Sequence, residues 1–292
     1  MLKHVTATLE ALHLLQPGRE LHYSLNITIG EAISISAFDS ATHFFQIKAS
    51  EFIDLTHEYA AYQRAWSAFP DFVPRPLGYA TRAGWHIMIS EGIFHTHFPA
   101  QLIALYEQAP QGPAADLMRF FAIGRQQILD ASATSNALLL EQLESYFAAT
   151  PHAQLAARWL QFARQQGVQA LAQVAQHGDF VLNNLACSGN KLVIFDWEDY
   201  GKISLPGLDL STLAMTVAGG NAATMGALAN ENAAIDQRLD AFLRRACALS
   251  EVDFGLFRRL IPVYLLVFLY LKRNYGLRVQ QRIGALLQQL SD

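Results

Sequence analysis

Between Leu21 and Ser90 the chain arranges its hydrophobic residues in short runs that polar turn signals separate. The segments "HYSLNITIG", "AISISAF", "THFFQIKA" and "GWHIMIS" are rich in β-branched and aromatic residues, with turn signals at Gly30 and in "DSAT". Such segments predict β-strands. A helical pattern, "EFIDLTHEYAAYQRAW", lies among them, and the prolines of "FPDFVPRPLG" predict a loop after it. The first part of the chain is therefore predicted to be a small sheet with one helix.

After Gly92 the hydrophobic residues recur at helical spacing over longer stretches. The segments "FPAQLIALYEQA", "ADLMRFFAIGRQQILDAS", "NALLLEQLESYFAA" and "AQLAARWLQFARQQGVQALAQVAQ" predict helices separated by Pro, Thr and Gly. The segment "AGGNAATMGALANEN" predicts a break between helices rather than a dinucleotide-binding loop. We therefore expect an α+β protein with a small β-rich lobe, residues 1–92, and a larger, mainly helical lobe, residues 93–292.

Two apolar segments raise the question of membrane contact. The first residues, "MLKHVTATLEALHLL", have the pattern of an amphipathic helix and not of a signal peptide. The longest apolar run, "LIPVYLLVFLYL", would form about 18 Å of helix, which is too short to cross a bilayer. A buried helix is predicted there, with membrane association as the alternative.

Composition narrows the class of partner. The chain has 292 residues, of which 52% are hydrophobic and 16% charged, with a formal net charge of -4. A phosphate backbone attracts basic proteins, so nucleic acid is not expected as a partner. The two cysteines, Cys187 and Cys247, are too few for a disulfide framework or a cysteine-built zinc site. A reducing, cytoplasmic setting is predicted.

Candidate chemistry is concentrated in "QHGDFVLNN" and the segment that follows it, "LACSGNKLVIFDWEDYG". Two apolar strands flank "SGN", which predicts a hairpin. Pairing these strands would bring Asn184, at the end of the first, near Asp196, at the end of the second, with Asp179 on the preceding loop. An amide and a carboxylate are oxygen ligands suited to Mg²⁺. A further carboxylate near the metal could orient a hydroxyl and take its proton.

The spacing of these residues is the spacing of a kinase catalytic loop. Asp179 and Asn184 form D-x-x-x-x-N, and Asp196 follows twelve residues later. With "HGD" and "DWE" in the places of H-R-D and D-F-G, "VPRPLGY" upstream and "LPGLDLSTL" downstream, the chain resembles the aminoglycoside phosphotransferase-like and choline kinase-like kinases of small molecules. The resemblance implies a two-lobed protein kinase-like fold.

The resemblance also implies a role for each matching residue. Asp179 would be the catalytic base that positions the acceptor hydroxyl. Asn184 and Asp196 would hold the magnesium ions that bridge the phosphates of ATP. His177 would support the loop from within. Asp209 would brace the loop by accepting its backbone N–H groups, although an aspartate there could also be a simple helix cap.

A phosphate-binding lysine paired with a helical glutamate is expected in the β-rich lobe. Lys48 is the only lysine between Lys3 and Lys191. Glu58 is its expected partner, with Glu51 closer along the chain, and an ordinary surface position for the lysine is the alternative. By analogy with the fold, the backbone between Ser90 and Gly92 would contact adenine.

Other features limit the resemblance. The segment "TIGEAIS" offers a single glycine, Gly30, in place of a glycine-rich phosphate loop. Only twelve residues lie between Asp196 and Asp209, and no A-P-E motif is present, which argues against a protein kinase. His95 and His97 have a spacing that can bind a metal on a strand, but without an evident third ligand they indicate a loop or acceptor-side role.

The sequence thus predicts an ATP- and Mg²⁺-dependent phosphotransferase that acts on a hydroxyl of a small molecule such as a sugar, an amino alcohol or an aminoglycoside-like compound. A nucleotide-binding pseudokinase with a regulatory or scaffolding role is the alternative from a different class. A helical interaction protein in which "HGD" is a coincidence is a third. The sequence leaves the oligomeric state and the acceptor open.

Overall fold

The computed structural model describes the chain apart from residues 28–31, 40–43, 106–110, 130–134, 275–276 and 291–292. Gly30, where the sequence predicted a turn and where a phosphate loop would lie, is outside the described residues. Most of the "DSAT" turn is outside them too. The chain divides into two compact units: Met1–Thr96 with Val193–Glu198, and His97–Leu192 with Asp199–Asp292.

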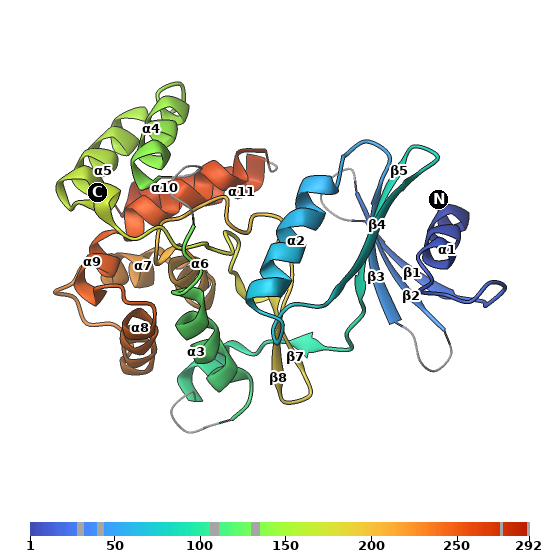
Figure 1. Ribbon diagram of the computed structural model, residues 1–292. Helices are drawn as coiled ribbons and strands as arrows, with labels where there is room; N and C mark the ends of the chain where they lie inside the picture. The colour runs from blue at the N-terminus through green and yellow to red at the C-terminus, as the bar shows by residue number, and fades with distance from the viewer. Residues whose placement is uncertain (28–31, 40–43, 106–110, 130–134, 275–276, 291–292) are drawn as a thin grey trace. The chain divides into compact units, whose positions relative to one another are not determined.

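The first unit contains a five-stranded antiparallel sheet with the strand order β1-β2-β3-β5-β4 (Figure 1). Its strands are β1 (His22–Ile27), β2 (Ile33–Phe38), β3 (Phe44–Ser50), β4 (Pro76–Arg82) and β5 (Trp85–Glu91). The β-rich character expected from the β-branched and aromatic runs is therefore confirmed.

Strand β4 corrects one expectation, since its first residue, Pro76, was predicted to lie in a loop. Pro76 lacks an N–H group, but β4 is an edge strand, where a proline at the start costs no ladder hydrogen bond. The register shifts between Pro76 and Gly78, which is a local irregularity of the pairing. A proline-rich segment can thus lead directly into an edge strand.

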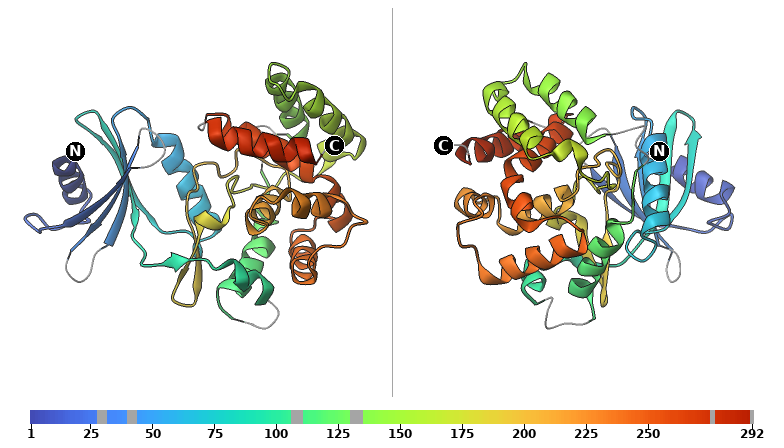
Figure 2. Two further views of the ribbon diagram at one scale, coloured as in Figure 1. Left: turned by 180° about the vertical axis from the view of Figure 1, so that it is seen from behind. Right: turned by 60° about the vertical axis from the view of Figure 1, so that its left-hand side comes forward.

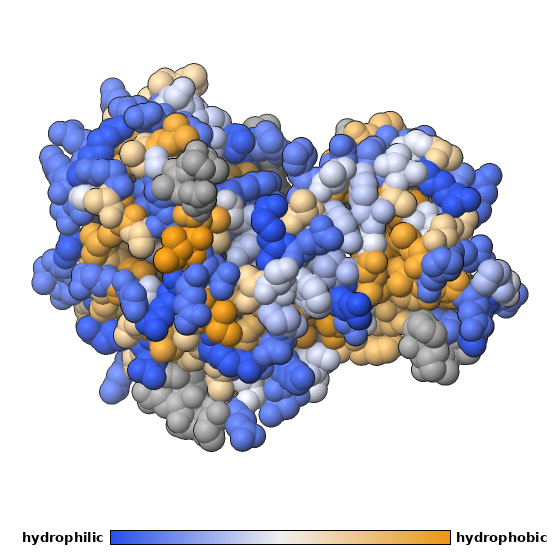
Figure 3. All heavy atoms as spheres, in the orientation of Figure 1, coloured by the Kyte–Doolittle hydropathy of each residue, from blue (hydrophilic) through white to orange (hydrophobic). Residues whose placement is uncertain are grey.

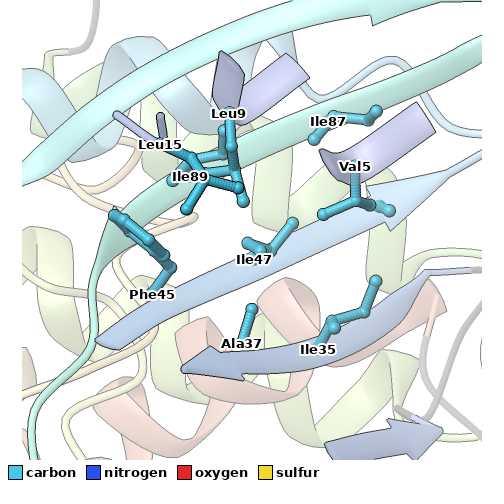
Figure 4. Close-up of a cluster of buried hydrophobic side chains, with 10 residues drawn as sticks. Val5, Leu9, Leu15, Ile35, Ala37, Phe45, Ile47, Ile87 and Ile89 are labelled. Atoms are coloured by element: carbon cyan, nitrogen blue, oxygen red, sulfur yellow. The ribbon is translucent and has the colours of Figure 1, made fainter. Parts of the chain in front are cut away.

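One face of the sheet carries the hydrophobic core of the first unit. Side chains alternate between the two faces of a strand, so Phe45, Ile47 and Ala49 of β3 share a face. Helix α1 (Leu2–Ala11) packs its apolar side there through Val5 and Leu9, both fully buried (Figure 4). The amphipathic helix predicted at the start of the chain therefore closes this core.

The opposite face of β3 is polar. The Gln46 side chain donates to Ser34 Oγ at 2.6 Å and accepts from Ser36 Oγ at 3.0 Å. Lys48 belongs to this same set of alternating positions. Helix α2 (Thr56–Ala68) lies on this side, across the sheet from α1 (Figures 1 and 2). The sheet thus separates a purely apolar core from a face that presents a lysine to a helix.

The second unit is mainly helical. Its α-helices are α3 (Pro113–Gly124), α4 (Asn136–Phe147), α5 (Ala153–Gln165), α6 (Leu208–Val217), α7 (Ala222–Ala229), α8 (Gln237–Leu249), α9 (Phe254–Arg259), α10 (Ile261–Leu271) and α11 (Leu277–Gln289). Helix α10 is apolar all round, and every residue from Ile261 to Leu269 is buried. The buried helix predicted for this apolar run is confirmed.

Helix α7 corrects another expectation, because the glycine- and alanine-rich segment around it was predicted to be a break. Asn221 accepts the N–H of Thr224 at 3.0 Å through its side chain and so caps the helix. Non-helical backbone flanks α7 on both sides, at Gly219 and Gly220, which have positive φ angles, and again from Asn230. A strong capping residue directly after the glycines was the signal for this helix.

A second sheet has the strand order β6-β7-β8 and includes the predicted hairpin. Its strands are β6 (Thr96–His97), β7 (Leu185–Ser188) and β8 (Lys191–Ile194), so Gly189 and Asn190 form the turn between β7 and β8. Among the described residues, no helix combines the length and apolar character needed to cross a membrane. Hydrophilic residues cover much of the surface drawn in Figure 3, with smaller apolar patches between them.

Candidate active site

The loop that precedes β7 is held from the start of α6. The backbone N–H groups of His177 and Gly178 donate to the Asp209 carboxylate at 2.7 and 2.9 Å. The N-cap residue of α6 is Gly207, whose φ of 92° only glycine adopts easily and where a Cβ atom would lie 2.6 Å from the Tyr264 hydroxyl. Asp209 lies inside the first turn, where its carboxylate accepts these two N–H groups, and it is not the cap residue.

The Asp209 carboxyl group is buried under this loop. Burial raises its pKa to about 7, against the opposing effect of the two N–H donors, which favour the carboxylate. The N–H group of Asp209 itself donates to Gln176 Oε1 at 3.2 Å. Loop and helix are therefore joined by three hydrogen bonds through one residue.

Gly178 stands where the catalytic loop of a protein kinase has arginine, and the structure gives the reason. Its φ angle is 88°, which L-residues rarely adopt. A Cβ atom at this position would lie 2.9 Å from the Cβ atom of Asp199. Both the backbone conformation and the available space therefore require glycine.

His177 lies beneath the loop and contacts it on both sides of Asp179. Its side chain is buried, and its Nδ1 atom accepts the N–H of Asp179 at 3.2 Å. The ring meets Phe180 edge-on, and Phe180 stacks on Phe120 with ring centroids 4.8 Å apart. An aromatic layer thus fixes the backbone on both sides of Asp179.

Asp179 and Asn184 are in direct contact. The Asn184 side-chain amide donates to the Asp179 carbonyl oxygen at 2.8 Å and to its carboxylate Oδ2 at 3.3 Å. The Asp179 side chain is 13% exposed. The structure therefore joins these two predicted site residues and ties the carboxylate to the short helical turn at Leu182–Asn184.

Sequence reasoning missed Lys272, which lies directly after α10. Its Nζ atom forms an ion pair with Asp179 Oδ2 at 2.9 Å and lies 3.7 Å from Asp199 Oδ2. The side chain is only 4% exposed. No motif pointed to it; the signal in the sequence was a lysine immediately after a fully apolar helix, where a charge needs a partner if it is buried.

In the first unit, Lys48 has the expected partner and a second one. Its Nζ atom donates to both carboxylate oxygens of Glu58, each at 2.8 Å, and to Glu198 Oε2 at 3.1 Å. Burial alone would lower the pKa of the ammonium, but Glu58 and Glu198 raise it above its ordinary value. The pairing with Glu58 is confirmed, and Glu198, from "DWE", is a partner that sequence reasoning missed.

Asp196 belongs to the first unit and has a φ angle of 62°, the left-handed region that aspartate tolerates better than most residues. The next residue, Trp197, is fully buried, donates from Nε1 to Ile194 O at 2.7 Å and stacks on Phe69. Asp179 and Asn184 belong to the second unit. The convergence of Asp196 with them stays a prediction.

The segment expected to contact adenine runs through the end of β5. Ser90 Oγ donates to Gln46 O at 3.3 Å, and the N–H of Gly92 donates to Phe44 O at 2.8 Å. The Gly92 N–H therefore already has an acceptor within the first unit. Nearby, His95 pairs through Nδ1 with Ile93 O at 2.7 Å, while His97 is exposed.

Comparison with known proteins identifies the class to which this fold and site belong. The family model described as the phosphotransferase enzyme family, APH, matches residues 44–249. The chain therefore belongs to this family, as the loop motif predicted. None of the curated proteins compared with the chain matches it by sequence.

Solved structures show the fold. Aminoglycoside phosphotransferase APH(4)-Ia, as a thermostable mutant in ternary complex with ADP and hygromycin B, is 13% identical with a TM-score of 0.62 over 97% of each chain. A predicted fructosamine-3-kinase from Thermobifida fusca is 13% identical with a TM-score of 0.64, covering 98% of this chain and 97% of the other. The α+β, protein kinase-like fold is confirmed.

Proposed function

We propose that the protein is an ATP-dependent, Mg²⁺-requiring phosphotransferase that moves the γ-phosphoryl group to a hydroxyl of a small molecule. The observation that carries the proposal is the Asp179 carboxylate, held by the Asn184 amide on a loop that Asp209 braces from α6. Family membership supports the same reaction type. Two of the similar structures hold ADP and an ATP analogue, and each also holds the small molecule hygromycin B.

The residues present fit a magnesium ion by their chemistry. The Asn184 amide nitrogen is used toward Asp179, so its oxygen is the atom that suits a hard cation, as do the carboxylate oxygens of Asp196. Among the described residues, no three His, Cys, Asp or Glu side chains are grouped to hold a metal. Magnesium needs no such group, because it keeps waters and shares substrate phosphates. Bound there, it would neutralise charge on those phosphates.

The reaction follows from the position of Asp179. An acceptor hydroxyl within about 2.6–3.2 Å of its carboxylate can donate a hydrogen bond to it. As the hydroxyl oxygen forms a bond to the γ-phosphorus, the bond from that phosphorus to the bridging oxygen breaks and ADP leaves. Asp179 accepts the hydroxyl proton. The brace from Asp209 and the amide of Asn184 hold the carboxylate for this contact, so positioning is the main contribution of the loop.

Lys48 is the group that we assign to the phosphates of ATP. Its ammonium is held by Glu58 and Glu198, so it is fixed in place and fully charged before a nucleotide arrives. A preorganised cation stabilises charge on a phosphoryl group without the cost of ordering a flexible side chain. We assign the adenine contact to the backbone of Ser90 and Gly92.

Transfer from γ-labelled ATP into a small-molecule extract tests the proposal. With Mg²⁺ present, the wild type is expected to label at least one compound, and Asp179→Asn to lower the rate by about 10²–10⁴-fold while MgATP affinity stays within a few fold. Asparagine keeps the size of the side chain but cannot take the proton. Equal labelling by the two proteins would contradict the role of Asp179.

A different outcome would favour another function. Tight MgATP binding without any labelled product would support a nucleotide-binding pseudokinase with a regulatory role. Absence of both binding and transfer would support a helical interaction protein. The same extract should be prepared from cytoplasm, the setting that we propose from the two buried free thiols, Cys187 and Cys247.

A further inference from the structure

Lys272 places a positive charge directly beside the carboxylate that meets the acceptor. Its ammonium lies 2.9 Å from Asp179 Oδ2, and its side chain is 4% exposed, so water screens it poorly. An acceptor hydroxyl bonded to Asp179 would therefore lie within a few ångströms of Nζ. Every charged substituent near that hydroxyl would interact electrostatically with the Lys272 ammonium.

The surroundings of Lys272 favour the charged ammonium. Asp179 and Asp199 are its carboxylate neighbours, and the ring of Phe268 lies 5.6 Å from Nζ. Aromatic faces attract cations. Lys272 is also the C-cap residue of α10, where the helix dipole favours positive charge. These four features oppose the desolvation that burial imposes on the ammonium.

Within the described residues of the second unit, Asp199 links Lys272 to a second lysine, Lys202. Asp199 Oδ1 pairs with Lys202 at 2.8 Å, and its Oδ2 atom lies near Lys272. In this unit the carboxylates of Asp179 and Asp199 thus face the ammonium groups of Lys272 and Lys202. Asp209, under the same loop, is engaged by backbone N–H groups. A cationic acceptor would gain little attraction from this group of charges and would face the Lys272 ammonium at short range.

We propose that Lys272 is a specificity-determining residue that excludes acceptors with a cationic group beside the reactive hydroxyl, so that the substrates are neutral or anionic hydroxy compounds. This inference rests on the proposed phosphotransferase function. Like charges about 6 Å apart in a partly buried site repel strongly enough to change affinity by at least roughly tenfold. The Lys272 ammonium would thus discriminate between acceptors by repelling the cationic ones.

Charge fractionation of the extract tests the inference. The extract, freed of nucleotides on charcoal, is separated by ion exchange at neutral pH into cationic, neutral and anionic pools. Each pool is then incubated with the protein, γ-labelled ATP and Mg²⁺. We expect the wild type to place at least ten times more label in the neutral and anionic pools than in the cationic pool.

Three variants assign the preference to Lys272. Lys272→Met, which removes the charge but keeps the length, should raise labelling of the cationic pool at least tenfold relative to the neutral pool. Lys272→Arg should keep the wild-type preference. Lys202→Met is the matched control, because Lys202 also pairs with Asp199 but is 59% exposed, and it should leave the preference unchanged.

Each outcome separates this inference from the proposed function. Wild-type label found mainly in the cationic pool, or an unchanged preference in Lys272→Met, would overturn the inference and leave the phosphotransferase standing. Label in no pool would overturn the proposed function and the inference with it. Should Lys272→Met not fold, Lys272→Gln, which also removes the charge, takes its place in the same assay and must raise labelling of the cationic pool.

Discussion

At the scale of single residues, the loop around Asp179 depends on backbone geometry as much as on charge. Gly178 combines a φ of 88° with a Cβ position 2.9 Å from the Asp199 side chain. Its N–H group is also one of the two that Asp209 accepts. Any side chain at Gly178 would shift Asp199, which lies near Lys272, and so would disturb the charges that meet Asp179.

The pKa of Asp209 predicts a pH dependence of stability. Burial raises it from 3.8 to about 7, so between these values the folded protein binds a proton that the unfolded chain lacks. Asp209 therefore contributes most to the free energy of unfolding below about pH 4, and this contribution falls as the pH rises to about 7. We compare the free energy of unfolding of the wild type with that of Asp209→Asn. The difference between the two is expected to fall by about 2–4 kcal/mol over this pH range.

Urea unfolding of both proteins at several pH values measures this difference. Subtracting the variant removes the contributions of all other titrating groups. A difference that stays constant with pH would mean that the N–H groups of His177 and Gly178 keep Asp209 ionised in spite of its burial.

At the scale of elements, the C-terminal end of α7 is held by one buried arginine of α9. Arg258 donates to the carbonyl oxygens of Ala227 at 2.6 Å and Leu228 at 2.8 Å, and to three more in the turn that follows. The last carbonyl groups of a helix have no partner within the helix. Arg258 supplies hydrogen-bond donors to these carbonyl groups of α7.

Replacing Arg258 is therefore expected to destabilise the second unit. Arg258→Met should lower the free energy of unfolding by about 2–4 kcal/mol, because it removes the donor of the buried Leu228 carbonyl group and of four part-buried ones. Arg258→Lys should restore only part of this, since an ammonium lacks the planar fork of donors. Arg259→Met is the control: its ion pair with Glu231 is exposed and should contribute less than about 1 kcal/mol. Equal losses in both methionine variants, measured by urea unfolding, would contradict this role.

Elements and site residues that follow local rules could be predicted from the sequence. Strands β1, β2, β3 and β5, helix α10 and the hairpin at Gly189 have strong local patterns, whereas β4 and β6 were not predicted. The pairing of Lys48 with Glu58 followed from the motif and its resemblance. Lys272 could not be predicted, because it reaches Asp179 from a helix that is 93 residues later in the chain. Glu198 was missed because a pairing between β3 and the end of the hairpin depends on tertiary packing alone.

At the scale of the whole molecule, the residues that we assign to MgATP are divided between the two units. Lys48 and Asp196 belong to the first unit, and Asn184 to the second. A ligand that binds only the folded protein raises its stability, by about 2.7 kcal/mol at a hundred times its Kd. The wild type should therefore melt several degrees higher with MgATP than without it.

Two variants separate nucleotide binding from chemistry in this melting experiment. Asp196→Asn should lose most of the rise in melting temperature, because it removes a charged oxygen ligand. Asparagine tolerates the φ angle of 62°, so the backbone should keep its conformation. Asp179→Asn should keep the rise, since Asp179 is assigned to the acceptor. ATP with EDTA is the control and should give a much smaller shift in all three proteins. Variants that behave alike in both melting and transfer would contradict this division of roles, because each carboxylate would then serve the same step.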